Sequence, residues 1–96
     1  MSEFTEYITL DGDSELSQYN NLGVQKCQTC EFDAGIAQFN QAIRLFPDAE
    51  VLYINRAVAF QGLGFTLSAI HDAAVASNIR KNKEGIRLRK RNRTNS

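Results

Sequence analysis

A repeat of 34 residues constrains the fold of this chain more than any other feature. When the sequence is shifted by 34 positions, apolar residues meet apolar residues and small residues meet small ones; the matched pairs are Tyr19/Tyr53, Gly23/Ala57, Gly35/Ala69, Ile36/Ile70, Ala42/Ala76 and Leu45/Ile79. A fixed period of this length is typical of folds that stack copies of one supersecondary unit. Because the chain has 96 residues, we expect two such units in one small domain.

The pattern within each unit predicts a pair of helices, so the whole chain is expected to have an all-α fold. Apolar and small residues recur at spacings of three and four within each half-unit, the pattern of one buried helical face. The expected helices begin after Asp13 or Ser14, at Asp33, near Ala49 and at Thr66, with Asp33 and Thr66 as N-cap candidates. Small residues fall where helices would cross, so that two backbones can approach closely; they are Gly23, Gly35, Ala57 and Ala69.

The spacing of Leu22-Gly23, Phe32, Gly35, Phe39, Ala42 and Pro47 resembles the signature of the tetratricopeptide repeat (TPR) family. The stretch LYINRAVAFQGLGFTLSAI is similar to a second unit, so the resemblance implies an α-solenoid fragment with units at about 16–49 and 50–82. The chain departs from the family at Lys26, where an aromatic residue is usual, and at Lys81, which replaces the closing proline.

Charge divides the chain into an acidic leader, a nearly neutral body and a basic end. Residues 1–14 are expected to be disordered, to lie extended along a neighbouring groove, or to pair as an edge strand with another copy. Residues 83–96 are expected to form a short capping helix over 84–91 and a basic tail, because the end of a solenoid needs a polar cover.

The TPR resemblance implies a non-catalytic adaptor that binds a partner peptide or helix in a groove lined by the first helix of each unit. The expected partner-binding residues are Asn20, Val24, Asn55 and Arg89. Some TPR proteins hold the C-terminal carboxylate of heat-shock chaperones in a clamp, of which Asn55 and Arg89 match two positions. Asn20, Val24 and Gly85 replace the other clamp residues, which leaves too few donors for a carboxylate.

Two other interpretations stay open beside the adaptor. An uncovered helical end or the leader could join copies into a homodimer or stack. The basic tail, with Arg87, Lys90, Arg91 and Arg93, could bind acidic partners, although nucleic-acid recognition is disfavoured because no aromatic residues interleave with the basic ones. A nuclear import signal would have the same composition.

No catalytic or cofactor motif occurs in the sequence, so we expect neither an enzyme nor a cofactor. Cys27 and Cys30 form one Cys-x-x-Cys pair, and with His71 as the only histidine a tetrahedral zinc site lacks ligands. We expect both cysteines on the core face of a helix and His71 at the surface. The opening residues lack a secretory signal, and no stretch is apolar enough to cross a membrane, which predicts a cytoplasmic protein with free thiols.

Overall fold

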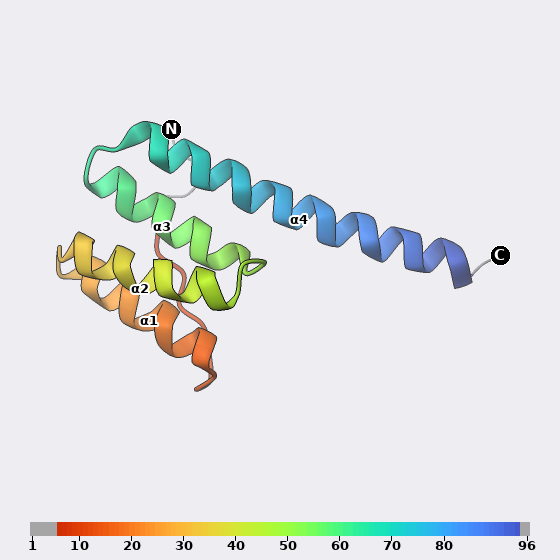
Figure 1. Ribbon diagram of the computed structural model, residues 1–96, viewed down its shortest axis with the longest axis horizontal. Coiled ribbons are helices and arrows are strands. Elements are labelled where there is room, and N and C mark those ends of the chain that lie inside the picture. The colour runs from red at the N-terminus through yellow and green to blue at the C-terminus, as the bar shows by residue number, and fades with distance from the viewer. Residues whose placement is uncertain (1–5, 95–96) are drawn as a thin grey trace.

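Four helices arranged as two hairpins make up the fold. The computed structural model describes the backbone of residues 6–94 and the side chains of residues 6–86. This part of the chain contains no strand, and its helices are α1 (Glu15–Gln28), α2 (Phe32–Leu45), α3 (Glu50–Gly62) and α4 (Thr66–Thr94). Helix α1 packs antiparallel to α2, α2 against α3, and α3 antiparallel to α4 (Figure 1). The predicted all-α class is confirmed.

The helix boundaries follow the expected capping residues only in part. Ser14 caps α1, and its side-chain oxygen accepts the N–H of Ser17 at 3.1 Å. The expected cap at Asp33 is wrong, because α2 already begins at Phe32 and Asp33 lies in its first turn. The reason is a tight turn at Cys30, whose φ of 64° reverses the chain at once. Thr66 is the first residue of α4 rather than its cap.

The core lies where α1, α2 and α3 meet, and two glycines allow that meeting. Phe39, Leu52 and Val24 are the largest apolar side chains buried there. A methyl group on Gly35 would overlap the sulfur of Cys27 and lie 2.7 Å from the carbonyl oxygen of Gly23. The backbones of α1 and α2 therefore touch at this crossing, as the two small residues predict.

Helix α4 is one continuous helix of 29 residues, and it projects beyond the rest of the molecule (Figure 1). The separate capping helix expected over 84–91 is therefore wrong, because those residues continue α4. The physical reason lies at Lys81, which stands where the repeat pattern has a helix-ending proline. With no proline between Thr66 and Thr94, the backbone hydrogen bonds of the helix continue through this position.

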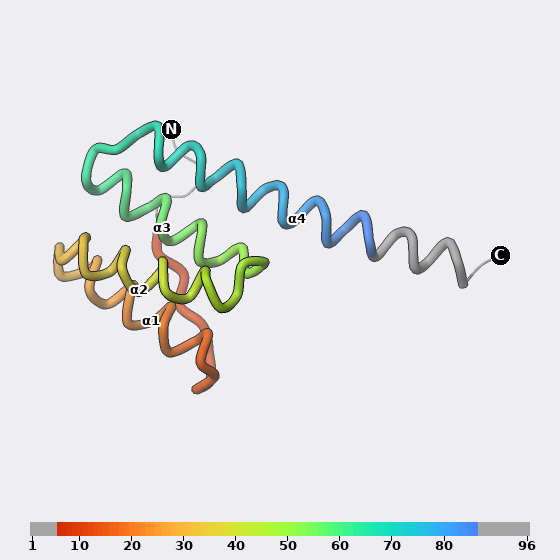
Figure 2. The backbone as a smooth tube through the Cα atoms, viewed as in Figure 1, coloured from red at the N-terminus to blue at the C-terminus, as the bar shows by residue number. Residues whose placement is uncertain are grey.

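The described part of the leader, residues 6–14, is extended and ordered against the body. Figure 2 traces it from α3 across to the start of α1. It turns through Gly12, which has a φ of 89°, while the carbonyls of Asp11 and Asp13 accept bonds from Ser17 and Gln18 of α1. Of the three arrangements considered for the leader, its described residues adopt the arm packed along a groove, and that groove belongs to the same chain. The expectation for residues 1–5 of the leader lies outside the described residues.

Candidate peptide-binding groove

Asn20 and Asn55, two of the four expected partner-binding residues, meet between α1 and α3, whereas Val24 belongs to the core cluster. Asn20 and Val24 project from α1 and Asn55 from α3. They are nearly or fully buried, with exposed fractions of 0%, 1% and 0%. The floor of this groove is therefore covered, and the segment next to it is the leader, residues 7–10.

The carboxamides of Asn55 and Asn20 hold both main-chain groups of Ile8. The Oδ1 atom of Asn55 accepts the Ile8 N–H at 2.7 Å, and its Nδ2 donates to the Ile8 carbonyl at 2.8 Å. Asn20 Nδ2 donates to the same carbonyl at 2.9 Å. Asn55 Nδ2 also donates to Asn20 Oδ1 at 2.7 Å, which fixes the two side chains relative to each other. Every polar atom of this pair is thereby used within a buried site.

A third carboxamide repeats this arrangement two residues along the leader. Asn21 accepts the N–H of Leu10 at 2.9 Å and donates to the Leu10 carbonyl at 2.8 Å. In an extended segment, main-chain groups two residues apart point the same way. Asn55 and Asn21 therefore act on the leader as a neighbouring strand would, although side chains of two helices supply the bonds.

Tyr7 is the side chain of the leader that reaches the core. It packs against the buried cluster and lies beside the thiol of Cys27. Burial raises the pKa of the Tyr7 phenol, and the hydrogen bond and charge of Cys27 raise it further. Burial likewise raises the pKa of the Cys27 thiol. Both groups are therefore protonated at neutral pH, and neither is an activated nucleophile.

The outcome for Arg89, the fourth expected residue, lies outside the described side chains. The same is true of Arg87, Lys90, Arg91 and Arg93 in the basic tail. The backbone of these residues belongs to α4, which extends away from the hairpins (Figure 1).

The two cysteines do not share the core face that the sequence predicts. Cys27 is buried, but Cys30 is exposed in the turn after α1, so the expectation for Cys30 is wrong. Its positive φ places it outside the helical pattern, because the helix has ended by Gln28. Among the described residues, no group of histidine, cysteine or acidic side chains has the arrangement of a metal site.

The second hairpin carries an ion pair at the place where the first has neutral residues. Arg56 of α3 makes two bonds of 2.8 Å to Asp72 of α4, and a third of 2.8 Å to Asn40 of α2. Asp72 is buried at 1% exposure, and its bond raises the pKa of the Arg56 guanidinium. His71 lies beside this pair and is exposed.

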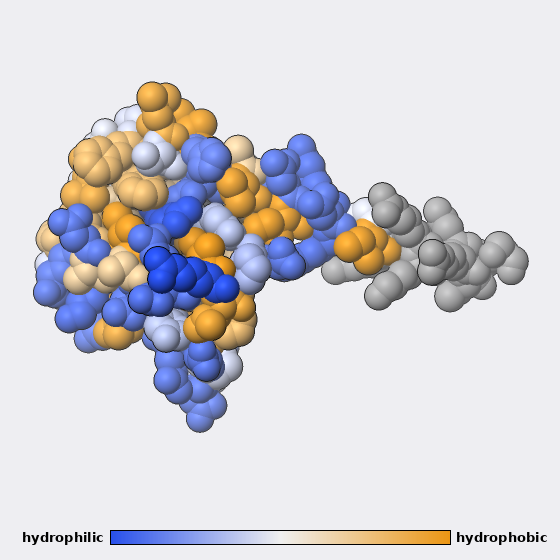
Figure 3. Space-filling model, in the orientation of Figure 1, coloured by the Kyte–Doolittle hydropathy of each residue, from blue (hydrophilic) through white to orange (hydrophobic). Residues whose placement is uncertain are grey.

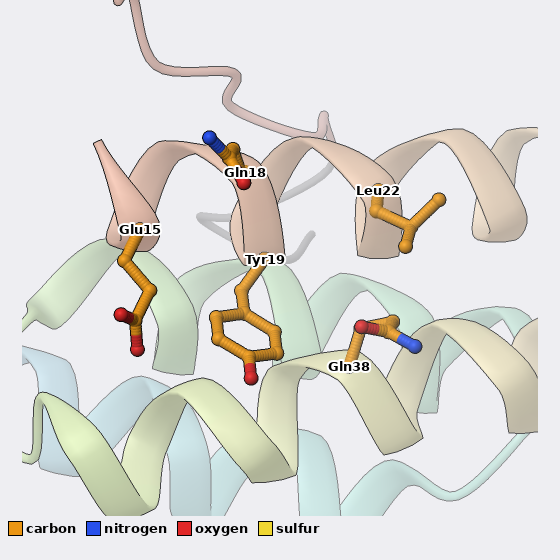
Figure 4. Close-up of a pocket in the computed structure, with 5 residues that line it drawn as sticks. All are labelled: Glu15, Gln18, Tyr19, Leu22 and Gln38. Carbon is orange, nitrogen blue, oxygen red and sulfur yellow. The ribbon is translucent and has the colours of Figure 1, made fainter. Parts of the chain in front are cut away.

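One repeat earlier, Leu22 and Gln38 occupy the positions of Arg56 and Asp72. They line a shallow pocket between α1 and α2 together with Glu15, Gln18 and Tyr19 (Figure 4). The ionisable groups that line it are the exposed carboxylate of Glu15 and the phenol of Tyr19. The Leu22/Arg56 mismatch in the repeat is thus explained by the Asp72 partner that Arg56 has in α4.

The sequence interpretation missed the residues that complete the groove. Asn21, Tyr7 and the main chain of Ile8 and Leu10 were not among its candidates. One signal was available: asparagine is a poor helix former, yet it occurs at three interior positions of α1 and α3. Asparagines at interior positions of a helix indicate that their side chains make hydrogen bonds outside the regular helix pattern.

The comparisons with known proteins add no family. No protein-family model matches the chain, and no solved structure matches it. No helix of the described residues is both long and apolar enough to cross a membrane.

Proposed function

We propose that this chain is a non-catalytic protein-interaction module of the TPR type, which binds an extended peptide segment in the groove between α1 and α3. One observation carries the proposal. The groove already holds an extended segment, residues 7–10, by bonds from Asn20, Asn21 and Asn55 to its main chain. A site that satisfies main-chain groups in this way suits a second peptide of the same conformation.

The repeat and the helix order support the same proposal. The TPR resemblance implies a groove lined by the first helix of each unit, and here these helices correspond to α1 and α3. The groove residues are neutral, which disfavours the chaperone carboxylate clamp, since a carboxylate needs cationic donors. The ligand we propose is therefore an internal peptide segment rather than a free C-terminus.

A displayed library of random peptides tests this function. Peptides selected on the intact chain are expected to shift the side-chain amide signals of Asn20 and Asn55 in NMR spectra. In a chain that also carries Ile8→Pro, which weakens the hold on the leader, Asn55→Ala is expected to weaken their binding about tenfold or more, because it removes both bonds of Asn55 to the peptide residue at the Ile8 position. Binding is measured by fluorescence anisotropy.

Gln41→Ala is the matched control, because Gln41 is an exposed residue of α2 outside the groove. Added to Ile8→Pro, this change is expected to leave binding of the selected peptides as it is in the Ile8→Pro chain. Both variants are checked for native helix content by circular dichroism at the binding temperature. Selected peptides that bind the folded Ile8→Pro, Asn55→Ala chain as tightly as the Ile8→Pro chain would contradict the proposed site.

The second candidate function, self-association, is favoured by the outward face of α4. Leu67 is 84% exposed and Ile70 60% exposed, and Figure 3 shows apolar surface at the end of the molecule where α4 begins. Ile36, which holds the position of Ile70 in the first unit, is half-buried against the core. A further helical layer would cover Ile70 in the same way, and a second copy is the occupant that we propose.

Sedimentation over a concentration series tests self-association. If two copies join through α4, the native chain forms a dimer and Ile70→Lys shifts the equilibrium to monomer. Gln41→Lys, on the exposed surface of α2, is the control for the added charge. A single monomeric species of the native chain at all concentrations would rule out this second function.

A further inference from the structure

We infer that leader residues 7–10 are an internal ligand of the groove, and that a partner segment must displace them. The inference rests on the proposed function and adds to it the kind of partner. That partner is an extended segment with an aromatic residue directly before the residue whose main chain Asn55 holds, and an apolar residue three positions after the aromatic one.

The main-chain bonds explain why the leader can be exchanged. The groove asparagines donate to and accept from the N–H and carbonyl groups of Ile8 and Leu10. Every residue except proline offers these two groups. An incoming extended segment can therefore replace each bond that the leader gives up.

Side-chain burial in the leader identifies which positions select the partner. Tyr7 packs against the core, and Leu10 is half-buried. Ile8 and Thr9 between them are exposed, and Ile8 keeps 41% of its surface open to solvent. Selection consequently falls on the first and fourth positions of the segment, which carry an aromatic and an apolar residue.

The groups that hold the segment are uncharged, which predicts how binding responds to salt. Asn20, Asn21 and Asn55 supply carboxamides, and Tyr7 contributes a neutral phenol beside a neutral thiol. Binding that depended on ion pairs would weaken as salt rises, because mobile ions screen exposed charges. Peptide binding in this groove is expected to be the same at low and high salt.

The short connection between the segment and α1 makes the leader a strong competitor. Only residues 11–14 separate Leu10 from the first residue of α1. A segment on such a short tether has an effective concentration in the millimolar range or above. A free peptide therefore binds well only when the hold on the leader is weakened.

The test uses the full chain and a fluorescein-labelled peptide of residues 4–13, FTEYITLDGD, as the probe. Ile8→Pro in the chain removes the N–H that Asn55 accepts, whereas Ile8→Ala keeps it and is the matched control. We expect Ile8→Pro to bind the probe at least about tenfold more tightly than the native chain does, and Ile8→Ala to bind it within about threefold of native.

A second chain variant, Tyr7→Ala, weakens the leader without using proline and is expected to tighten probe binding in the same direction. A probe that carries the same Tyr7→Ala change is expected to bind Ile8→Pro at least about tenfold more weakly, since it lacks the aromatic anchor. Circular dichroism of each variant confirms that the helices are retained.

The possible outcomes separate this inference from the proposed function. Equal probe binding by the native chain and by both leader variants would overturn the displacement, while peptide binding in the groove would stand. Tight binding of the altered probe would overturn the aromatic selection. Absence of probe binding to every folded variant would overturn the inference and the proposed groove ligand together.

Discussion

At the scale of single residues, the buried asparagines combine a cost to the helices with a role in the groove. Asparagine lowers helix stability relative to alanine, but Asn20 and Asn55 are fully buried and bonded to each other and to Ile8. Sequence reasoning alone would expect Asn20→Ala with Asn55→Ala to weaken partner binding without lowering the melting temperature. Burial changes that expectation, because the double variant leaves Ile8 groups unpaired and must also lose stability.

The crossing of α1 and α2 gives a prediction about glycine. Gly35→Ala is expected to destabilise the fold by about 1–3 kcal/mol, because the added methyl meets Cys27 and the backbone of Gly23. Gly85→Ala is the control: a methyl there meets nothing within 4 Å, and alanine favours a helix interior. Urea unfolding measures both variants. Equal unfolding midpoints for Gly35→Ala and the native chain would show that the crossing is not tight.

Residue patterns predicted some of the groove and could not predict the rest. Asn20, Val24 and Asn55 were expected from the TPR resemblance, which implies a groove lined by the first helix of each unit. The partner of Asn55 does not follow, since it is the main chain of Ile8, 47 positions away. Main-chain groups are the same in every residue, so they leave no mark in a sequence pattern.

At the scale of helices, the repeat set the number and order of α1 to α4, and local turn chemistry set their ends. Tertiary packing buries Gly23 and Gly35, so their spacing was informative. Local backbone conformation decides where a helix ends, and a single residue can change it. This holds for the turn at Cys30 after α1 and for the continuation of α4 past Lys81. The all-α class was therefore predictable, while the separate last helix was not correct.

Lys81→Pro restores the residue that the repeat pattern has at this position, and it is expected to end α4 near Arg80. The proline has no N–H, and its ring clashes with the carbonyl four residues earlier. Circular dichroism should report loss of the helical signal of residues 81–94, since a proline in a helix interior ends the helix. The urea midpoint should change little, because the last buried core residue is Ala76.

Lys81→Ala separates loss of the charge from loss of the helix. Alanine favours the helix, so this control is expected to keep the native ellipticity. Native ellipticity in Lys81→Pro would contradict the view that the missing proline lets α4 continue.

At the scale of the whole molecule, the leader joins helices that belong to different hairpins. Helix α2 of the first hairpin packs against α3 of the second, and the leader adds another connection, from α1 to α3, through Asn20, Ile8 and Asn55. In a simple stack of repeats, each unit interacts only with its neighbour along the chain. This second connection couples the two hairpins, so they are expected to unfold together.

Alkaline pH is expected to weaken this connection. The pKa values of Tyr7 and Cys27 are both raised by burial, so the folded state holds these protons more tightly than the unfolded chain does. Their stabilising effect is complete below the ordinary thiol value of about 8.5 and is lost as pH rises above it. The urea midpoint should therefore be lower at about pH 10.5 than at about pH 7. These two pH values lie on either side of the ordinary pKa values of a thiol and a phenol.

Tyr7→Phe keeps the ring in the groove and removes the phenol titration. The part of the midpoint loss above the ordinary phenol value of about 10 should then disappear. A midpoint of the native chain that is the same at both pH values would show that neither group is coupled to folding.

The order of synthesis gives the leader a further consequence. A ribosome makes residues 7–10 before α1, and the carboxamide of Asn55 that binds Ile8 is made 47 residues after Ile8. Until α3 emerges, the leader has only half of its binding site, and its main-chain groups are open to other proteins near the nascent chain. Residues 7–10 therefore dock onto α1 and α3 late in synthesis and folding, after both hairpins have begun to form.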